Sequence, residues 1–214
     1  MTRVKICGLA TADALEAAIG AGADMAGFVF FAPSPRHLSF EAARALSERA
    51  GDRIEKVALT VDADDATLDA IVEAIRPDLI QLHGTETPER AAAIRARTGR
   101  RVMKAIGVSG AADAERARDY RDGVDLILFD AKPPPGAVLP GGNGRVFDWS
   151  VLRGVDPGPP WMLSGGLDVG NAAQALSVTG AAGLDVSSGV ERAPGVKDSD
   201  LIRAFVAEVR AFAL

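Results

Sequence analysis

The sequence predicts an α/β fold in which residues 1–214 form a single-domain (β/α)8 barrel. Eight short apolar or β-branched runs alternate with Ala-, Glu- and Arg-rich stretches of helical periodicity. Such alternation is typical of a parallel sheet with right-handed crossovers. Eight units over 214 residues average about 27 residues each, which is close to the length of a minimal βα unit.

The expected strands lie at 3–7, 25–31, 56–61, 78–82, 102–106, 125–130, 161–164 and 183–187. Apolar residues three and four positions apart, with Gly or Pro near the ends, predict helices at 12–21, 40–50, 67–75, 88–97, 111–120 and 170–178. Four helix-to-strand junctions resemble one another, at 22–24, 76–78, 122–125 and 180–183, which indicates a repeated unit. An open, doubly wound sheet has the same local pattern and is the alternative fold.

Composition excludes several classes of function. The 24 basic and 29 acidic residues give a net charge of −5, so a nucleic-acid partner is not expected. One cysteine and two histidines allow neither a disulfide framework nor a Cys/His zinc site. No secretory signal and no apolar run near 18 residues is present, so we expect a cytoplasmic protein without a membrane partner.

In a barrel, the functional residues lie where strands give way to loops at their carboxyl ends. Cys7 closes the first expected strand, on the same face as Lys5, and is followed by Gly8. As a thiolate it could act as a general base or nucleophile, while a small buried hydrophobe is the structural alternative. Asp130 ends the sixth strand above Leu126 and Leu128, where an apolar setting would suit a general acid, or it caps a loop.

Small residues follow the seventh and eighth strands, at 164–168 and 185–191. Their backbone N–H groups and hydroxyls could reach a phosphate, at the position where barrels commonly hold one. The segment 131–145 after the sixth strand contains four prolines and four glycines. We expect it to be a functional loop, whose glycines at 141–144 add to the phosphate site, and a domain linker is the alternative.

Two further side chains follow strands. Arg36, after the second strand, could grip a carboxylate through its bidentate fork, or it is a solvated surface arginine. His83, within 81–84, could face a ligand or be a satisfied polar residue of a loop. With His37 as the other imidazole, metal catalysis by histidine ligands is not expected.

As a set, these residues resemble the phosphoribosylanthranilate isomerase family, single-domain (β/α)8 TIM barrels of tryptophan biosynthesis. The matching segments run in order along the chain: KICG at 5–8, GAD at 22–24, GFVF at 27–30, SPR at 34–36, QLHG at 81–84, KAIG at 104–107, FD at 129–130, GGNG at 141–144, FDW at 147–149, SGGL at 164–167, DVSSGVE at 185–191 and PGVKD at 194–198.

The resemblance implies an Amadori rearrangement of N-(5-phosphoribosyl)anthranilate to 1-(2-carboxyphenylamino)-1-deoxyribulose 5-phosphate, without cofactor or metal. Asp130 would be the general acid, Cys7 the general base, and Arg36 the partner of the anthranilate carboxylate. The phosphate-binding residues would be Gly142, Gly144, Gly165, Gly166, Ser187 and Ser188. Gln81, His83 and Asp185 would face the substrate, and members occur as monomers and homodimers.

Some positions depart from the family pattern, namely Ala10, the third strand around Thr60, and Asn143. None of them is a proposed acid, base or carboxylate partner, so they bear on the lining of the pocket. A related histidine-pathway isomerase, or an enzyme acting on both substrates, would carry an aspartate where Cys7 stands. A metal-dependent epimerase would need further histidines, and a phosphate-binding protein or an oxidation-sensing thiol are the alternatives without turnover.

Overall fold

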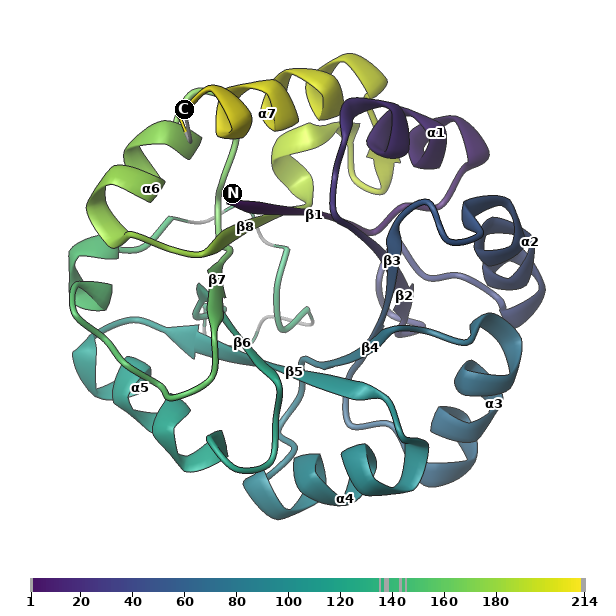
Figure 1. The fold of residues 1–214 in the computed structure, drawn as a ribbon, viewed down its shortest axis with the longest axis horizontal. Helices are drawn as coiled ribbons and strands as arrows, with labels where there is room; N and C mark the ends of the chain where they lie inside the picture. The colour runs from purple at the N-terminus through teal and green to yellow at the C-terminus, as the bar shows by residue number, and fades with distance from the viewer. Residues whose placement is uncertain (1, 135, 137–138, 143, 145, 213–214) are drawn as a thin grey trace.

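The computed structural model describes residues 2–134, 136, 139–142, 144 and 146–212, so the departure at Asn143 lies outside the described residues. Eight parallel strands follow one another around a closed barrel, and β1 pairs with both β2 and β8 (Figure 1). The predicted (β/α)8 barrel is confirmed, and the open-sheet alternative is wrong. The strands are β1 (Arg3–Cys7), β2 (Met25–Phe30), β3 (Glu55–Thr60), β4 (Leu79–Leu82), β5 (Arg101–Val108), β6 (Leu126–Ala131), β7 (Trp161–Leu163) and β8 (Gly183–Val186).

The helices surround the barrel, as Figure 1 shows, and are α1 (Ala12–Ala21), α2 (Phe40–Ala50), α3 (Asp65–Ile75), α4 (Pro88–Thr98), α5 (Ala111–Glu115), α6 (Ala172–Thr179) and α7 (Ser199–Phe212). The helix predicted at 111–120 is correct only in its first half, because Arg116–Tyr120 continues as a 3-10 helix. Helix α7 and a short hairpin of β9 (Glu191–Ala193) and β10 (Val196–Lys197) were not predicted.

The helix ends follow local side-chain chemistry. Thr11, Ser39, Asp64 and Thr87 each precede a helix and accept a hydrogen bond from the backbone N–H three residues further on. This satisfies a donor that the first turn leaves unpaired. Glycines in the left-handed conformation end α1, α4 and α6.

Three of the four repeated junctions, those at 22–24, 76–78 and 122–125, have a common structure at the amino ends of the strands. The Asp24 carboxylate accepts from the N–H of Val4 at 2.6 Å. In the same way Asp78 accepts from Lys56 at 2.7 Å, and Asp125 accepts from Val102 at 2.9 Å. The junction aspartate therefore ties its strand to the preceding or neighbouring one, which explains why this short pattern recurs along the sequence.

Two apolar layers hold the barrel. The outer faces of the strands, among them Val4, Ile6 and Phe28, pack under the helices. The interior is filled by the side chains of Met25, Val57, Leu79, Met103, Ala105, Leu126, Leu128 and Met162. Toward the carboxyl ends, polar inward-facing residues replace this interior layer. The predicted inward face shared by Lys5 and Cys7 is confirmed by their burial on the opposite side from Val4 and Ile6.

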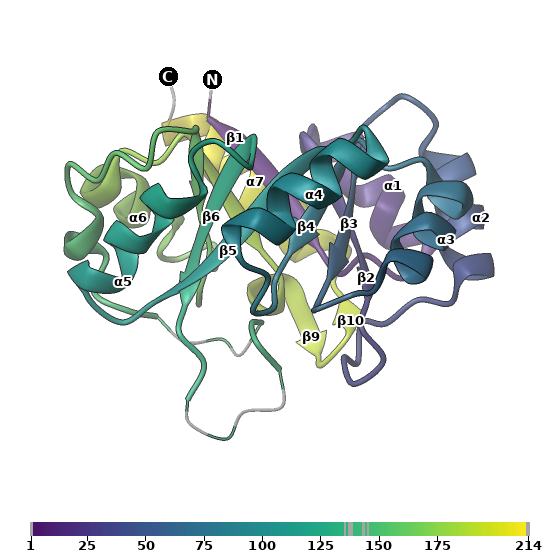
Figure 2. The ribbon, with the colours of Figure 1, turned by 90° about the horizontal axis from the view of Figure 1, so that it is seen from below.

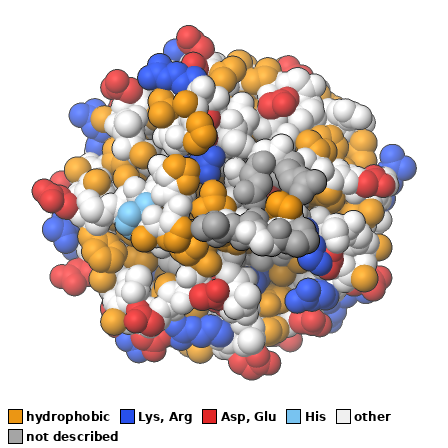
Figure 3. All heavy atoms as spheres, turned by 180° about the vertical axis from the view of Figure 1, so that it is seen from behind, with side chains coloured by type: hydrophobic (Ala, Val, Ile, Leu, Met, Phe, Trp, Pro, Cys, Tyr) orange, Lys and Arg blue, Asp and Glu red, His pale blue; other side chains and the backbone are white. Residues whose placement is uncertain are grey.

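The segment after β6 and the β9–β10 hairpin extend from the same end of the barrel, opposite the chain termini (Figure 2). Because β7 continues the same barrel, the interpretation of 131–145 as a domain linker is wrong. Seen from this end, charged side chains lie mostly around the rim, and hydrophobic and uncharged atoms lie toward the centre (Figure 3). Within the described part of the chain, no helix has the length and apolar character needed to cross a membrane.

Candidate active site

A cavity opens at the carboxyl ends of the strands. Its lining includes eleven of the twelve residues expected in the site: Cys7, Arg36, His83, Asp130, Gly142, Gly144, Gly165, Gly166, Asp185, Ser187 and Ser188. The twelfth, Gln81, is fully buried and reaches the site through His83 rather than lining it. The topology therefore brings together residues that are up to 181 positions apart in the sequence.

Cys7 lies at the end of β1 with only 5% of its surface exposed. A methyl group at Gly27 would lie 3.2 Å from both the Cys7 sulfur and the Lys5 amine, so thiol and amine face the same point. Burial raises the pKa of the Cys7 thiol, and the Lys5 ammonium opposes this only in part. The neutral thiol is thus favoured in the resting protein, and the thiolate that forms from it is a stronger base.

Lys5 forms a buried ion pair with Asp185, with its amine 2.8 Å from the carboxylate. The Ser164 hydroxyl donates to the other carboxylate oxygen at 3.2 Å. Burial alone would lower the pKa of Lys5, but Asp185 and Cys7 raise it above its ordinary value. Lys5 is therefore a permanent cation beside Cys7. Strand alternation placed it on the inward face, but the sequence alone gave it no role.

Asp130 lies at the end of β6 and is 4% exposed. One of its carboxylate oxygens accepts from the N–H of Ala131 at 2.8 Å, and the other lies 3.2 Å from His83 Nε2. The Gln81 amide nitrogen lies 3.2 Å from His83 Nδ1. With Gln81 donating to Nδ1, the imidazole carries its hydrogen on Nε2 and donates it to Asp130. His83 therefore contacts the proposed acid directly.

Arg36 is only 6% exposed, so its interpretation as a solvated surface arginine is wrong. Its Nε and Nη2 donate to the two carboxylate oxygens of Glu191 at 2.7 and 2.8 Å. One edge of the predicted bidentate fork is therefore occupied within the protein, while Nη1 lies beside Gly142 at the cavity. Burial would lower the pKa of Arg36, but Glu191 raises it, so the guanidinium stays charged.

Glu191 also pairs with Lys197, whose amine lies 2.7 Å from its carboxylate. Lys197 donates in addition to the backbone oxygen of Ser187 at 2.9 Å, and the Ser187 hydroxyl donates to the Cys7 carbonyl at 3.2 Å. Burial lowers the pKa of Lys197, which Glu191 only partly offsets. The sequence pattern contained both residues, at 185–191 and 194–198, but no signal showed that the hairpin folds back onto Arg36.

The two sides of the cavity differ in chemistry. Glycines and serines from the ends of β7 and β8 line one side, where backbone N–H groups and hydroxyls are available to an anion. Val29, Leu59 and Val61 line another part and suit an apolar ring. Among the described residues, no group of three or more His, Cys, Asp or Glu side chains is placed to hold a metal ion.

The whole chain resembles proteins of one family. Residues 4–208 match the profile of the family described as N-(5'phosphoribosyl)anthranilate (PRA) isomerase. The N-(5'-phosphoribosyl)anthranilate isomerase of Azorhizobium caulinodans is 63% identical over 208 residues, covering 97% of this chain and 91% of that protein. The corresponding protein of Parvibaculum lavamentivorans is 58% identical, covering 95% and 96%.

Solved structures agree. Phosphoribosyl anthranilate isomerase from Thermotoga maritima has a TM-score of 0.89 and 36% identity, covering 99% of this chain and 100% of that one. A phosphoribosyl anthranilate isomerase in complex with reduced 1-(o-carboxyphenylamino)-1-deoxyribulose 5-phosphate has a TM-score of 0.85 and 34% identity, with the same coverage. On its sequence and its fold, the chain belongs to the phosphoribosylanthranilate isomerase family.

Proposed function

We propose that this chain converts N-(5-phosphoribosyl)anthranilate to 1-(2-carboxyphenylamino)-1-deoxyribulose 5-phosphate, with Asp130 as general acid and Cys7 as general base. The observation that carries the proposal is the single cavity that both residues line together with Arg36. Family membership supports the reaction, and the chemistry of the lining residues supports the assignment of roles.

The first step needs an acid. Asp130 gives its proton to the furanose ring oxygen, the bond from that oxygen to C1 breaks, and the lone pair of the anthranilate nitrogen forms the C1=N bond of an iminium ion. Asp130 lies above the apolar Leu128 and lines the cavity, so a bound substrate can reach the proton donor. Its contacts with Ala131 and His83 fix the direction of the carboxyl group.

The second step needs a base. The Cys7 thiolate removes the proton from C2, and the electron pair of that C–H bond forms the C1=C2 double bond of an enolamine. The enolamine then tautomerises to the ketone at C2, so that C2 is oxidised and C1 reduced within one molecule. No external oxidant or reductant is required. Lys5 faces the sulfur and stabilises the thiolate while it exists.

The two ends of the substrate fit the two kinds of lining. The phosphate would bind the N–H groups and hydroxyls near Gly142, Gly144, Gly165, Gly166, Ser187 and Ser188. The anthranilate carboxylate would bind the edge of Arg36 that Glu191 leaves open. Asp185 lines the cavity and is held by Lys5 and Ser164, so we assign it to the support of Lys5.

The partners follow from the same proposal. The substrate is a small phosphorylated sugar amine, and the chain acts in the cytoplasm as a monomer or homodimer without a cofactor. One of the similar solved structures concerns monomers generated from the dimeric isomerase of Thermotoga maritima, which makes the homodimer a state to measure.

The direct test follows the fluorescence of phosphoribosylanthranilate, made from anthranilate and phosphoribosyl pyrophosphate by the preceding transferase. Chelator-treated protein should accelerate the loss of fluorescence beyond spontaneous hydrolysis. Cys7→Ser should lower kcat by at least about 100-fold and leave binding of a reduced product analogue nearly intact. Turnover by Cys7→Ser close to that of the original protein would remove Cys7 from the mechanism.

A further inference from the structure

Another buried ion pair lies beside the cavity but does not line it. The Lys104 amine of β5 is 2.9 Å from the Glu86 carboxylate, and each side chain is only 3% exposed. Taking two charges out of water is costly, and such a pair contributes little net stability compared with apolar residues of similar volume. The role of this ion pair therefore depends on the other groups to which the two side chains are hydrogen-bonded.

The pair encloses the backbone on both sides of His83. Lys104 donates to the carbonyl oxygens of Leu82 at 3.4 Å and Gly84 at 2.7 Å. Glu86 accepts from the N–H of Gly84 at 3.0 Å. The N–H of His83 itself donates to the Thr60 carbonyl at 2.9 Å. The main chain that carries the imidazole is thus fixed before, at and after His83.

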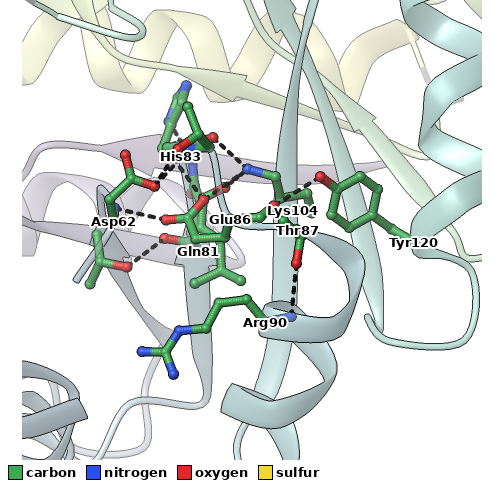
Figure 4. Close-up of polar contacts among 12 residues, drawn as sticks. Asp62, Gln81, His83, Glu86, Thr87, Arg90, Lys104 and Tyr120 are labelled. Carbon is green, nitrogen blue, oxygen red and sulfur yellow. Dashed lines mark hydrogen bonds and ion pairs between the residues drawn. The ribbon is translucent and has the colours of Figure 1, made fainter. Parts of the chain in front are cut away.

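The same carboxylate ties this turn to the end of β3. Glu86 accepts from the N–H of Asp62 at 2.9 Å, and Figure 4 shows Glu86 between Asp62 and Lys104. Asp62 has a φ of 48° and accepts from the N–H of Thr85 at 2.7 Å. A Cβ at Gly84 would lie 2.5 Å from the Asp62 carboxylate, so only glycine fits this packing. The turn therefore has a single tightly determined arrangement.

We propose that Lys104 and Glu86 are positioning residues for the isomerisation, which fix His83 and through it the carboxyl group of Asp130. This inference rests on the proposed function, because it needs Asp130 to act as the acid. His83 Nε2 lies 3.2 Å from Asp130, so a shift of the turn moves the contact on the proton donor. Misplacement of a catalytic group by about 1 Å can cost on the order of 100-fold in rate.

The test is a double-mutant cycle on the fluorescence assay, with phosphoribosylanthranilate as the probe. Lys104→Met should lower kcat roughly 10- to 100-fold and leave KM within about twofold, because the substrate contacts are untouched. In a His83→Ala background, Lys104→Met should change kcat by less than about twofold, because its route to Asp130 is already gone. Effects that multiply in the double variant, or an unchanged kcat in either single variant, would overturn the inference.

A stability comparison separates positioning from folding. Lys104→Met leaves the Glu86 charge buried without its cation, whereas Glu86→Gln with Lys104→Met removes both charges and keeps a side-chain oxygen that can accept from the N–H of Asp62 or Gly84, so the double variant should regain part of the lost stability to urea. Its kcat should stay low. Recovery of kcat together with stability would show a purely structural pair and overturn the inference.

Two controls complete the design. Arg95→Met removes an ion pair with Asp125 at the opposite end of β6 and should leave kcat unchanged. Asp130→Asn tests the proposed function independently: full turnover by that variant would refute the acid assignment itself, whatever the result for Lys104. Loss of turnover in Asp130→Asn with multiplying effects of Lys104→Met would instead refute only the positioning role.

Discussion

The two ends of the barrel use charged residues in opposite ways. At the amino end, Asp24 and Asp125 accept backbone N–H groups and also pair with Arg210 and Arg95, whose side chains are 25% and 49% exposed. At the carboxyl end, the pair of Lys5 and Asp185 is almost completely buried, with 0% and 5% of the two side chains exposed.

The more exposed ion pairs at the amino end serve the stability of the fold, whereas the buried pairs at the carboxyl end serve the proposed reaction. The partly exposed ion pairs at the amino end lose little hydration when they form, and each contributes modestly to the free energy of folding. Buried pairs at the carboxyl end bring a desolvation cost and are retained where the chemistry needs oriented charges. Both ends belong to the same strands, so matched substitutions can test the contrast within one element.

The largest effect is expected from Asp130, near the carboxyl end of β6, when it is compared with Asp125, which directly precedes that strand. Asp130→Asn removes the proton donor and should lower kcat by at least about 100-fold, with little change in stability. Asp125→Asn should keep kcat and cost about 1 kcal/mol in the free energy of unfolding, because it weakens the bonds to Arg95 and to the Val102 N–H. Steady-state kinetics and urea titration of both variants check this. Equal losses of kcat would break the contrast between the two ends.

The next effect concerns Arg36. Arg36→Ala should raise KM by roughly 10- to 100-fold, because it removes the open edge of the guanidinium that would bind the substrate carboxylate, while Glu191 keeps its ion pair with Lys197. Arg36→Lys keeps the positive charge, but a lysine amine cannot donate in bidentate geometry to both Glu191 and the substrate carboxylate. This variant should therefore recover only part of the substrate affinity. A large loss of kcat with unchanged KM would contradict the role in substrate binding.

A third test uses the pH dependence of Cys7. Burial raises the thiol pKa in the folded protein, so the reactive thiolate is scarce at neutral pH and increases as the pH rises into the alkaline range. Alkylation by iodoacetamide reports on this residue alone, because the chain has one cysteine.

Lys5→Met removes the cation beside Cys7 and leaves the Asp185 carboxylate without its ion-pair partner, and both changes raise the pKa of the Cys7 thiol further. Alkylation at pH 8 should slow by on the order of tenfold. Equal or faster alkylation of the variant would show that Lys5 does not favour the thiolate.

Sequence patterns were sufficient for the barrel because each unit carries its own signals. The strand periodicity, the helix caps such as Thr11 and Ser39, and the recurring junction aspartates are all local. Strand alternation also placed Cys7 and Asp130 at the carboxyl ends and inside the barrel. The matched segments of the family then identified the residues that line the cavity.

The remaining features depend on contacts between distant segments. The bond of Arg36 to Glu191 joins residues 155 positions apart, and that of Lys5 to Asp185 joins residues 180 positions apart. No periodicity encodes such pairings. Gln81 was expected to face the substrate, but its inward direction at the end of β4 places it behind His83, where its amide meets the ring. The β9–β10 hairpin is an addition to the repeating βα unit. Helix α7 is the helix of the eighth unit, and its buried residues Ile202, Phe205, Val206 and Val209 have helical spacing, so the sequence does carry a local signal for it.

The smallest expected effect is that of salt on the ion pairs at the two ends of the barrel. Arg95→Met should cost only about 0.5–1 kcal/mol in the free energy of unfolding, because the pair with Asp125 is partly exposed. At 1 M NaCl the Debye length falls to about 3 Å, so most of this cost should disappear. The cost of Asp185→Asn should persist at high salt, because the Lys5 pair is shielded from ions by burial. Urea titrations of both variants at low and high salt measure the difference. A salt dependence of the same size at both ends would mean that solvent ions reach the Lys5–Asp185 pair as easily as the Arg95–Asp125 pair. The burial of the Lys5–Asp185 pair could then no longer explain why Lys5 remains a fixed cation beside Cys7.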